Sequence, residues 1–316
     1  MENFVTLFDS LFLPQGLALN ESLEKHAGNY TLWILCIDEA AYEVLNSLHL
    51  LNVKLIRLAD VETPDLKRVK GGRTRAEYCW TLTPFTPRFV FERDDTIQRV
   101  TYLDADLWFR KSPRPIFEEF EASGKHVLIT DHAYAPEYDS SDKNGQYCVQ
   151  FMTFERDSSE KVRQWWEERC IEWCYAHYED GKLGDQKYLD DWTERFPTQV
   201  HVLQQKEWTL GPWNTTRFPY GTSRFYHFHG LRILKNRKIF LGGYPLSDPV
   251  INGIYLPYLD ALNRAFKSLN SVGFIPKPQK EDKFLISSLK FLKYFILGMY
   301  LQTWRFNSQN YLYLRK

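Results

Sequence analysis

The N-terminal part of the chain alternates short apolar runs with segments whose apolar positions recur at helical spacing. The apolar runs predict buried strands, and the segments between them predict helices. The expected strands are Phe4–Phe8, Tyr30–Ile37 and Val53–Leu58, and the expected helices are Gly16–His26 and Glu39–Leu48. Strands that alternate with helices in this way favour an α/β fold, with a parallel sheet covered by helices on both faces. Such sheets bind ligands at the carboxyl ends of their strands.

The middle of the chain continues this pattern with further strands and longer helices. We expect strands at Val100–Leu103, Val127–Thr130 and Tyr147–Phe154, and helices at Arg73–Trp80 and Glu160–His177. A turn led by Gly184 is expected to open another helix. The long helix would place Cys170 and Cys174 on one face, four residues apart. No second cysteine pair stands at metal-binding spacing, so a packing role is the interpretation for both.

An Asp-X-Asp sequence, Asp104-Ala105-Asp106, directly follows the strand that ends at Leu103. In extended backbone, residues two apart point the same way, so the pattern predicts two neighbouring carboxylates. Burying such a pair is costly unless a cation neutralises it, and oxygen ligands suit Mg²⁺ or Mn²⁺. Such a cation often bridges protein carboxylates to phosphates. The alternative is a chance occurrence, because about one Asp-X-Asp is expected in a chain of this length.

Other acidic residues also follow expected strands, namely Asp9, Asp38 and Asp60. Asp38 and Asp60 are better explained as helix or loop caps, which leaves Asp9 as a candidate site residue. Arg73, at the start of the predicted helix Arg73–Trp80, could have either of two roles. It could pair with Glu77 at i, i+4 as a surface salt bridge, or it could steer a diphosphate.

Two histidines, His227 and His229, precede Gly230. A lone histidine is usually a core residue whose ring nitrogens have hydrogen-bond partners. Two histidines at i, i+2, in a chain that also carries Asp-X-Asp, favour a third metal ligand.

Composition narrows the class of protein. The chain has 316 residues, a hydrophobic content of 44% and no net charge, so it can form a sizeable core and does not suggest a nucleic-acid partner. Its five cysteines are scattered, and its N-terminus lacks the basic region of a secretory signal, so we expect reduced thiols in the cytoplasm.

The C-terminal segment has a different character. Between residues 265 and 316 there are nine lysines and arginines against two acidic residues, and Phe284–Leu301 is strongly apolar. The longest uncharged run, Tyr294–Trp304, is too short to span a bilayer. We expect a catalytic domain at 1–250 and a helical extension at 251–316. The extension could lie on an anionic membrane surface as a basic amphipathic helix, or it could pack on the catalytic domain.

Four motifs in order carry a family resemblance. They are Tyr102-Leu103-Asp104-Ala105-Asp106, Gly184-Asp185-Gln186, Trp213-Asn214 and His227-Phe228-His229-Gly230. Together they resemble bacterial family 8-like glycosyltransferases of the GT-A fold, over about residues 3 to 245. The resemblance implies a Rossmann-like sheet that binds a nucleotide-sugar. It also implies a Mn²⁺ (or Mg²⁺) ion that clamps the sugar's diphosphate.

Carried over by position, the resemblance assigns a role to each motif residue. Asp104, Asp106 and His227 would hold the metal, while His229 falls on a variable position. Asp185 and Gln186 would lie near the anomeric carbon. The residues expected to contact the donor nucleotide are Asp9, Arg73, Asp104, Trp213 and Asn214.

One departure concerns the stretch Cys148–Phe151, where the family usually has Asn-Ala-Gly. Gln150 stands in place of the glycine that lets the sugar approach the backbone, so the donor sugar is left open. The family's final Lys-Pro-Trp is also missing, and Arg232 or Lys235 could take over its phosphate contact.

These observations predict a metal-dependent glycosyltransferase that uses a UDP-sugar, with retention of configuration implied by the family. Its expected acceptor is a glycan or lipid-linked glycan of surface polysaccharide or lipopolysaccharide synthesis. Its expected location is the cytoplasm, on the inner face of the membrane. The alternatives are a sugar-nucleotide phosphohydrolase or nucleotidyltransferase that uses the same metal site, and an inactive nucleotide-sugar-binding scaffold protein.

Overall fold

The computed structural model describes residues 1–279 and 311–313, and it is built around a seven-stranded sheet in the order β3-β2-β1-β4-β7-β6-β8. The strands are β1 (Glu2–Phe8), β2 (Tyr30–Cys36), β3 (Val53–Arg57), β4 (Arg99–Leu103), β6 (Val127–Asp131), β7 (Tyr147–Glu155) and β8 (Val200–Val202). Strands β3, β2, β1 and β4 run parallel, as the alternating pattern predicts. Strand β7 runs antiparallel to both of its neighbours, so the sheet is mixed rather than wholly parallel. The predicted α/β class is confirmed.

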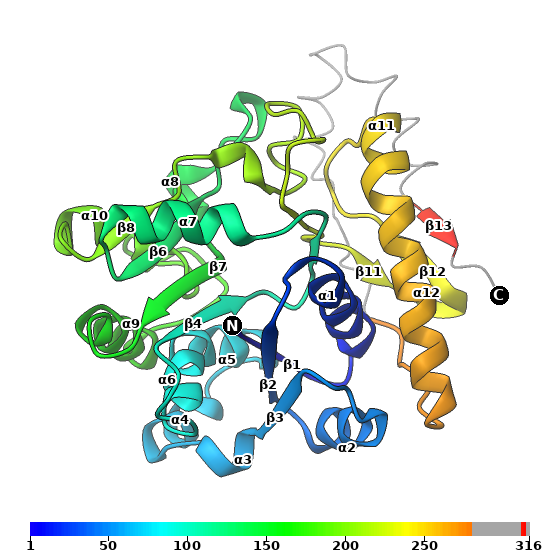
Figure 1. Ribbon diagram of the computed structural model, residues 1–316, viewed down its shortest axis with the longest axis horizontal. Coiled ribbons are helices and arrows are strands. Elements are labelled where there is room, and N and C mark those ends of the chain that lie inside the picture. The colour runs from blue at the N-terminus through cyan, green and yellow to red at the C-terminus, as the bar shows by residue number, and fades with distance from the viewer. Residues whose placement is uncertain (280–310, 314–316) are drawn as a thin grey trace.

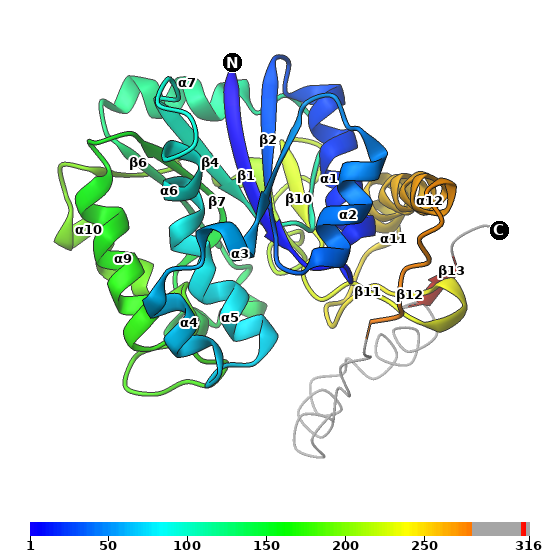
Figure 2. The ribbon, with the colours of Figure 1, turned by 90° about the horizontal axis from the view of Figure 1, so that it is seen from below.

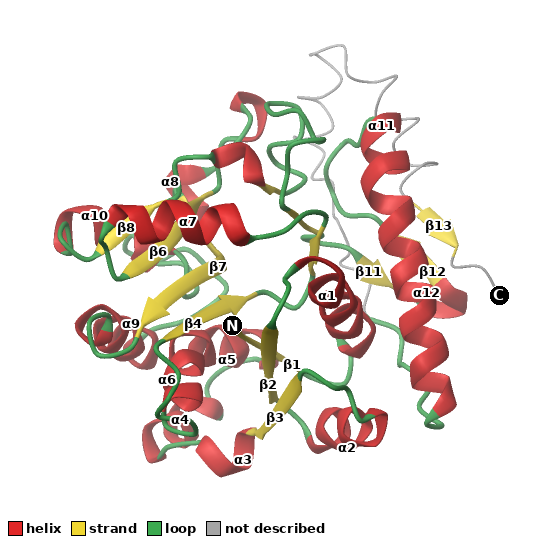
Figure 3. Ribbon diagram, in the orientation of Figure 1, coloured by secondary structure: helices red, strands yellow, loops and turns green. Residues whose placement is uncertain are grey.

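Helices cover both faces of this sheet, with the strands lying between them (Figures 2 and 3). One face carries α1 (Leu13–His26), α2 (Glu39–Leu48) and α7 (Arg114–Ser123). The other face carries α5 (Arg75–Leu82), α6 (Thr86–Phe91), α9 (Glu160–Glu172) and α10 (Trp192–Arg195), with the short helices α3 (Leu58–Val61) and α4 (Pro64–Lys70) beside them.

The alternation of side chains along β1 shows how the two cores form. Phe4 and Phe8 pack into the core under α1 and α2, whereas Val5 and Leu7 pack into the core under α5, α6 and α9. Both faces of the strand are buried, which is why it reads as a continuous apolar run rather than as an alternating one.

Two three-stranded sheets flank the central one. The first has the order β5-β10-β9, with β5 (Leu107–Phe109), β9 (Thr209–Leu210) and β10 (Phe225–His227). The second has the order β11-β12-β13, with β11 (Arg232–Ile233), β12 (Lys238–Phe240) and β13 (Tyr311–Tyr313). Strands of two or three residues are too short to show a periodic pattern, so the sequence does not predict them.

Several predicted helix bounds are corrected. Helix α9 ends at Glu172, and the backbone of Trp173 is extended, so Cys170 and Cys174 do not share a helix face. Both cysteines are nevertheless buried in one core cluster as free thiols, in agreement with a packing role. The turn at Gly184 leads into a 3-10 helix, η3 (Lys187–Asp191), rather than an α-helix.

Helix α12 (Leu256–Ser271) packs along α1 (Figure 1). After α12 the chain returns to the domain, where the Gln279 side chain accepts a hydrogen bond from Ile233 N at 2.9 Å and donates one to Leu11 O at 3.2 Å. No helix in the described part of the chain is long and apolar enough to cross a membrane. The predicted basic amphipathic segment, Phe284–Leu301, lies outside the described residues.

Candidate metal and donor site

The Asp-X-Asp sequence occupies the turn between β4 and β5. Strand β4 ends at Leu103, and Leu107 N donates a hydrogen bond to Asp104 O at 3.2 Å, which closes the turn. Asp104 N in turn donates to Gln150 O on β7 at 3.0 Å. The side chains of Asp104 and Asp106 are 22% and 18% exposed, so both can be reached from solvent.

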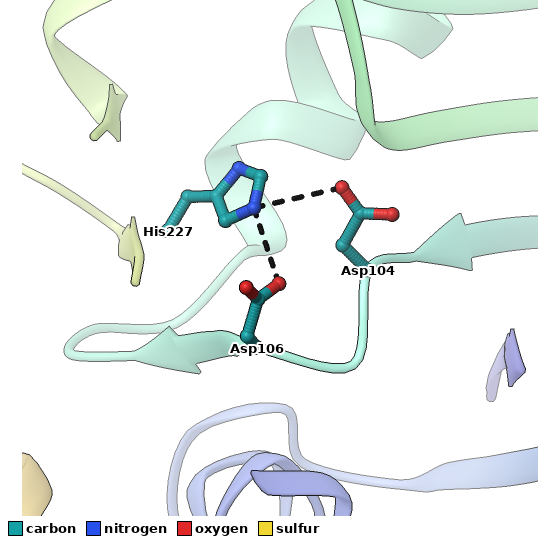
Figure 4. A group of neighbouring side chains, drawn as sticks. All are labelled: Asp104, Asp106 and His227. Atoms are coloured by element: carbon teal, nitrogen blue, oxygen red, sulfur yellow. Dashed lines mark ion pairs between the residues drawn. The ribbon is translucent and has the colours of Figure 1, made fainter. Parts of the chain in front are cut away.

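His227 meets these carboxylates because β10 lies beside β5. In the antiparallel pairing His227 faces Leu107, and Phe228 N donates to Asp106 O at 3.0 Å. The imidazole Nε2 is 3.1 Å from Asp106 Oδ1 and 3.7 Å from Asp104 Oδ2 (Figure 4). One possible ligand atom from each of the three residues lies within 4.8 Å of the others. The structure therefore brings together residues that lie more than a hundred positions apart in the sequence.

The electrostatics of this group favour a positive charge at its centre. Burial alone would lower the pKa of His227, but the carboxylate of Asp106 raises it well above its usual value. Burial would raise the pKa of Asp106, and the charge of His227 lowers it instead. Burial raises the pKa of Asp104, a shift that His227 only partly opposes and the second carboxylate reinforces.

The donor set fits a small divalent cation. Two carboxylates and one imidazole suit Mn²⁺ or Mg²⁺, and the imidazole favours Mn²⁺ of the two. The Nδ1 atom of His227 lies 3.0 Å from the side-chain oxygen of Gln150. With Nδ1 facing Gln150, Nε2 is the nitrogen that faces the carboxylates, and a bound cation would take the place of the Nε2 proton that is directed at Asp106.

Asp185 lies close to this group, at the beginning of the turn before η3. Its side chain is buried, and Oδ2 has no hydrogen-bond partner among the described residues. Burial, reinforced by the charge of Asp104, raises the pKa of Asp185 to about 7. The indole of Trp166 donates a hydrogen bond to the backbone oxygen of Asp185 at 2.8 Å, which fixes this part of the turn.

Gln186 lies next to Asp185 but uses its side chain on the backbone. Its Nε2 donates to Asn144 O at 2.7 Å, and its Oε1 accepts from Val149 N at 3.4 Å. Gln186 therefore ties the turn to the start of β7. The predicted contact with the anomeric carbon stays a prediction.

Trp213 and Asn214 lie next to the metal-binding group and contact its neighbouring backbone. The Trp213 indole lies edge-on to His227, with ring centroids 5.4 Å apart, and its Nε1 donates to His132 O at 2.8 Å. Asn214 is fully buried and also donates to His132 O, at 3.0 Å. Both side chains hold the backbone of His132 in place beside His227. Their predicted contact with the donor stays a prediction.

A second cluster forms at the carboxyl ends of β1 and β2. Asp38 caps α2, as predicted, by accepting from Ala41 N at 3.0 Å. Arg75 Nη1 lies 3.3 Å from Asp9 Oδ2 and 3.2 Å from Asp38 Oδ2. Burial raises the pKa of Asp9, although the Leu11 amide and Arg75 oppose this shift. Asp9 thus stands at the same sheet edge as Asp104.

Arg73 does not pair with Glu77, which was one of its two predicted roles, and its predicted contact with a diphosphate stays a prediction. Arg73 precedes α5, because Thr74 and Glu77 form a capping box there, so it cannot pair with Glu77 at i, i+4 along the helix. Its guanidinium donates instead to Thr81 Oγ1 and to Ile171 O. The arginine that joins the acidic cluster is Arg75, two residues further on.

The structure adds two residues that sequence reasoning did not assign to the site. Tyr102 donates its hydroxyl proton to Asp104 Oδ1 at 2.8 Å. Its position two residues before Asp104, on the same side of the strand, could have indicated this contact. Gln150 stood out only as a departure from the family pattern, and no local signal connects it to His227.

Comparisons with known proteins place the chain in a family. No protein-family model matches it. The uncharacterized protein YfnD of Bacillus subtilis (strain 168) is 29% identical over 308 residues, which cover 90% of this chain and 98% of YfnD. The uncharacterized protein YfnF of the same organism is 31% identical over 255 residues, which cover 75% of this chain and 84% of YfnF.

A solved structure identifies the fold. The galactosyltransferase LgtC, crystallised with donor and acceptor sugar analogues, matches 87% of this chain and 98% of its own with a TM-score of 0.51. The two sequences are only 12% identical, so this likeness shows the fold alone. The chain therefore belongs to the family of YfnF and has the GT-A fold of glycosyltransferases, as its four motifs predict.

Proposed function

We propose that this protein is a metal-dependent glycosyltransferase that moves a sugar from a UDP-sugar to a glycan or lipid-linked acceptor, with retention of the anomeric configuration. The observation that carries the proposal is the convergence of Asp104, Asp106 and His227 within 4.8 Å, at the carboxyl edge of a GT-A sheet. Ligands of α/β sheets bind at that edge. Mn²⁺ is the proposed metal, with Mg²⁺ as the substitute.

The cation, when bound, offsets the negative charge that builds up on the leaving diphosphate. The chain's own residues bind and orient the donor around it. Arg75, the first residue of α5, and Asp9, at the end of β1, are proposed to hold the nucleoside. Arg232, whose charge helps to lower the pKa of Asp106, is proposed to contact a phosphate.

Asp185 is proposed to bind the transferred sugar. Its buried Oδ2 lacks a partner in the described part of the chain, so a sugar hydroxyl would satisfy it. A carboxylate at this point would also stabilise positive charge that develops at the anomeric carbon. Gln186 would keep Asp185 in place through its two backbone contacts.

The acceptor proposal rests on the sequence of the C-terminal segment. Its basic and apolar residues suit the surface of an anionic membrane. We therefore propose a cytoplasmic enzyme, attached to the inner face of the membrane, that acts in surface polysaccharide or lipopolysaccharide synthesis.

Product analysis separates this proposal from its alternatives. The protein is incubated with a panel of UDP-sugars, Mn²⁺, soluble glycosides and a lipid-linked glycan, and the products are identified by mass spectrometry. Transfer gives UDP and an extended glycan, and these should disappear in the Asp106→Ala variant. Free sugar without an extended glycan would indicate a hydrolase, and unchanged donor under all conditions would indicate a scaffold.

A further inference from the structure

We propose that Gln150 is the positioning residue of the metal site, with its side-chain oxygen accepting the Nδ1 proton of His227 so that Nε2 becomes the ligand atom. This inference rests on the proposed metal-dependent function. It assigns a role to a residue that touches neither the proposed donor nor the cation.

The contacts of Gln150 reach two of the three proposed ligands. Its side chain meets His227 Nδ1 at 3.0 Å, and its backbone oxygen accepts a hydrogen bond from Asp104 N, also at 3.0 Å. Gln150 is fully buried within β7, which has antiparallel partners on both sides. Through these two contacts Gln150 is connected to both Asp104 and His227.

The orientation of the carboxamide decides which imidazole nitrogen can bind a cation. If Oε1 accepts from Nδ1–H, that proton stays on Nδ1, and Nε2 is the nitrogen that can give up its proton to a cation held by Asp104 and Asp106. The reverse orientation would make Nδ1 an acceptor and hold the only ring proton on Nε2, which would oppose cation binding there. The contact with His227 is the only side-chain hydrogen bond that Gln150 makes among the described residues, since its Nε2 has no partner there.

Cys148 is the competing acceptor, because its buried thiol also interacts with the imidazole of His227. A thiol sulfur is a weak hydrogen-bond acceptor compared with a carboxamide oxygen. We therefore expect Gln150 rather than Cys148 to orient the ring. The glycine that the resembled family usually has at this position offers no such side chain.

The test measures binding of Mn²⁺ alone by electron paramagnetic resonance, so it does not depend on activity. Gln150→Met keeps the approximate volume and removes the acceptor, and it should weaken Mn²⁺ binding about 10- to 100-fold, the usual effect of losing a partner of a ligating histidine. Gln150→Glu restores an acceptor and should bind Mn²⁺ within a few-fold of the wild type. Cys148→Ala should bind it as the wild type does.

The matched control is Thr153→Val on the same strand, which removes the buried hydrogen bond between Thr153 and Thr101 at 2.9 Å. It should lower the melting temperature without changing Mn²⁺ affinity. Wild-type Mn²⁺ affinity in Gln150→Met, or a loss in Cys148→Ala alone, would overturn the inference. If Asp106→Ala also kept full Mn²⁺ affinity, the proposed metal site itself would fail, which is a different result.

A measurement on the wild type covers the case in which Gln150→Met does not fold. In the Zn²⁺-loaded protein, which is diamagnetic, nitrogen-15 NMR of the histidines should show His227 with a protonated Nδ1 and a metal-bound Nε2. A protonated Nε2 with a free Nδ1 would contradict the inference.

Discussion

At the scale of single residues, the raised pKa of Asp185 makes the stability of the protein depend on pH. Because the pKa is about 7 in the folded protein against 3.8 as the ordinary value, the folded state holds a proton that the unfolded state has lost between these pH values. The free energy of unfolding therefore falls as the pH rises through this window. Full ionisation would cost on the order of a few kcal/mol.

The variant Asp185→Asn tests this sign directly. Denaturation by urea in the presence of EDTA is measured at several pH values from 5 to 8. The wild type should lose stability relative to the variant as the pH rises, because the uncharged amide has no proton to lose. Parallel stability curves for the two proteins would contradict the assigned pKa.

A second residue-scale prediction concerns Gln186, which holds the turn next to Asp185. In Gln186→Ala both backbone contacts are lost, so the sugar-binding carboxylate loses its fixed position. We expect turnover to fall roughly 100-fold, the scale of a misplaced group near a reacting centre, with little change in UDP affinity. Equal losses of rate and of UDP binding would place Gln186 in the nucleotide site instead.

At the scale of elements, the loop Gly211–Asn214 supplies the indole of Trp213 that packs against His227. A Cβ atom on Gly211 would lie 2.6 Å from the ring of Trp213, whose indole packs edge-on against His227. Gly211→Ala should therefore push the indole towards the metal site. Overpacking of this kind costs about 1–3 kcal/mol, so we expect a lower melting temperature together with weaker Mn²⁺ binding.

Gly221→Ala is the control for this prediction, because no atom of the described residues, apart from its two chain neighbours, lies within 4 Å of a Cβ at that position. It should leave both the melting temperature and the Mn²⁺ affinity near those of the wild type. A Gly211→Ala protein that is destabilised but binds Mn²⁺ normally would show that Trp213 does not support His227.

The sequence predicts some strands and helices well and others poorly. The strands β1 and β2 were predicted because each is a largely apolar run next to a clear helical pattern, and β3 was predicted from its apolar residues after a helical pattern, although Lys54 and Arg57 interrupt them. The antiparallel direction of β7 was not predicted, since an apolar run carries no direction. Helix α9 was predicted too long because the aromatic and cysteine residues after Glu172 continue its apolar spacing, although the backbone turns there.

Sequence reasoning predicted which side chains lie close together where the pattern is local, and it missed contacts between segments that are far apart in the sequence. Asp104 and Asp106 follow from their spacing, and His227 from a motif, whereas the contact between Gln150 and His227 joins two strands that are far apart in sequence. Arg73 and Arg75 are both basic and close together. Only the capping box of Thr74 and Glu77 determines that Arg75 is the one that reaches Asp9.

At the scale of the whole molecule, the question is what residues 280–316 do. Removing them leaves Gln279, which anchors the preceding segment to Ile233 and Leu11. The truncated protein should detach from anionic liposomes, because each lysine near such a surface contributes ~1 kcal/mol. It should still transfer sugar to a soluble acceptor. Sedimentation with liposomes and melting curves check both points.

Replacement of Lys280, Lys283, Lys290 and Lys293 by glutamate is the matched full-length variant, since it keeps β13. It should also weaken liposome binding, and high salt should weaken wild-type binding only in part, because salt does not screen the apolar contribution. If the truncated protein misfolds while the charge variant still binds liposomes, the segment belongs to the domain and the membrane proposal is wrong.

The central claim is that Asp104, Asp106 and His227 form one metal site that holds the nucleotide. Calorimetric titration of UDP into the wild type and into Asp106→Ala, each with Mn²⁺ and with EDTA, tests it most directly. We expect UDP to bind the wild type with Mn²⁺ and to bind it much more weakly with EDTA. Asp106→Ala should bind UDP weakly under both conditions. UDP binding of equal strength in all four titrations would show that these three residues do not form a metal site for the nucleotide.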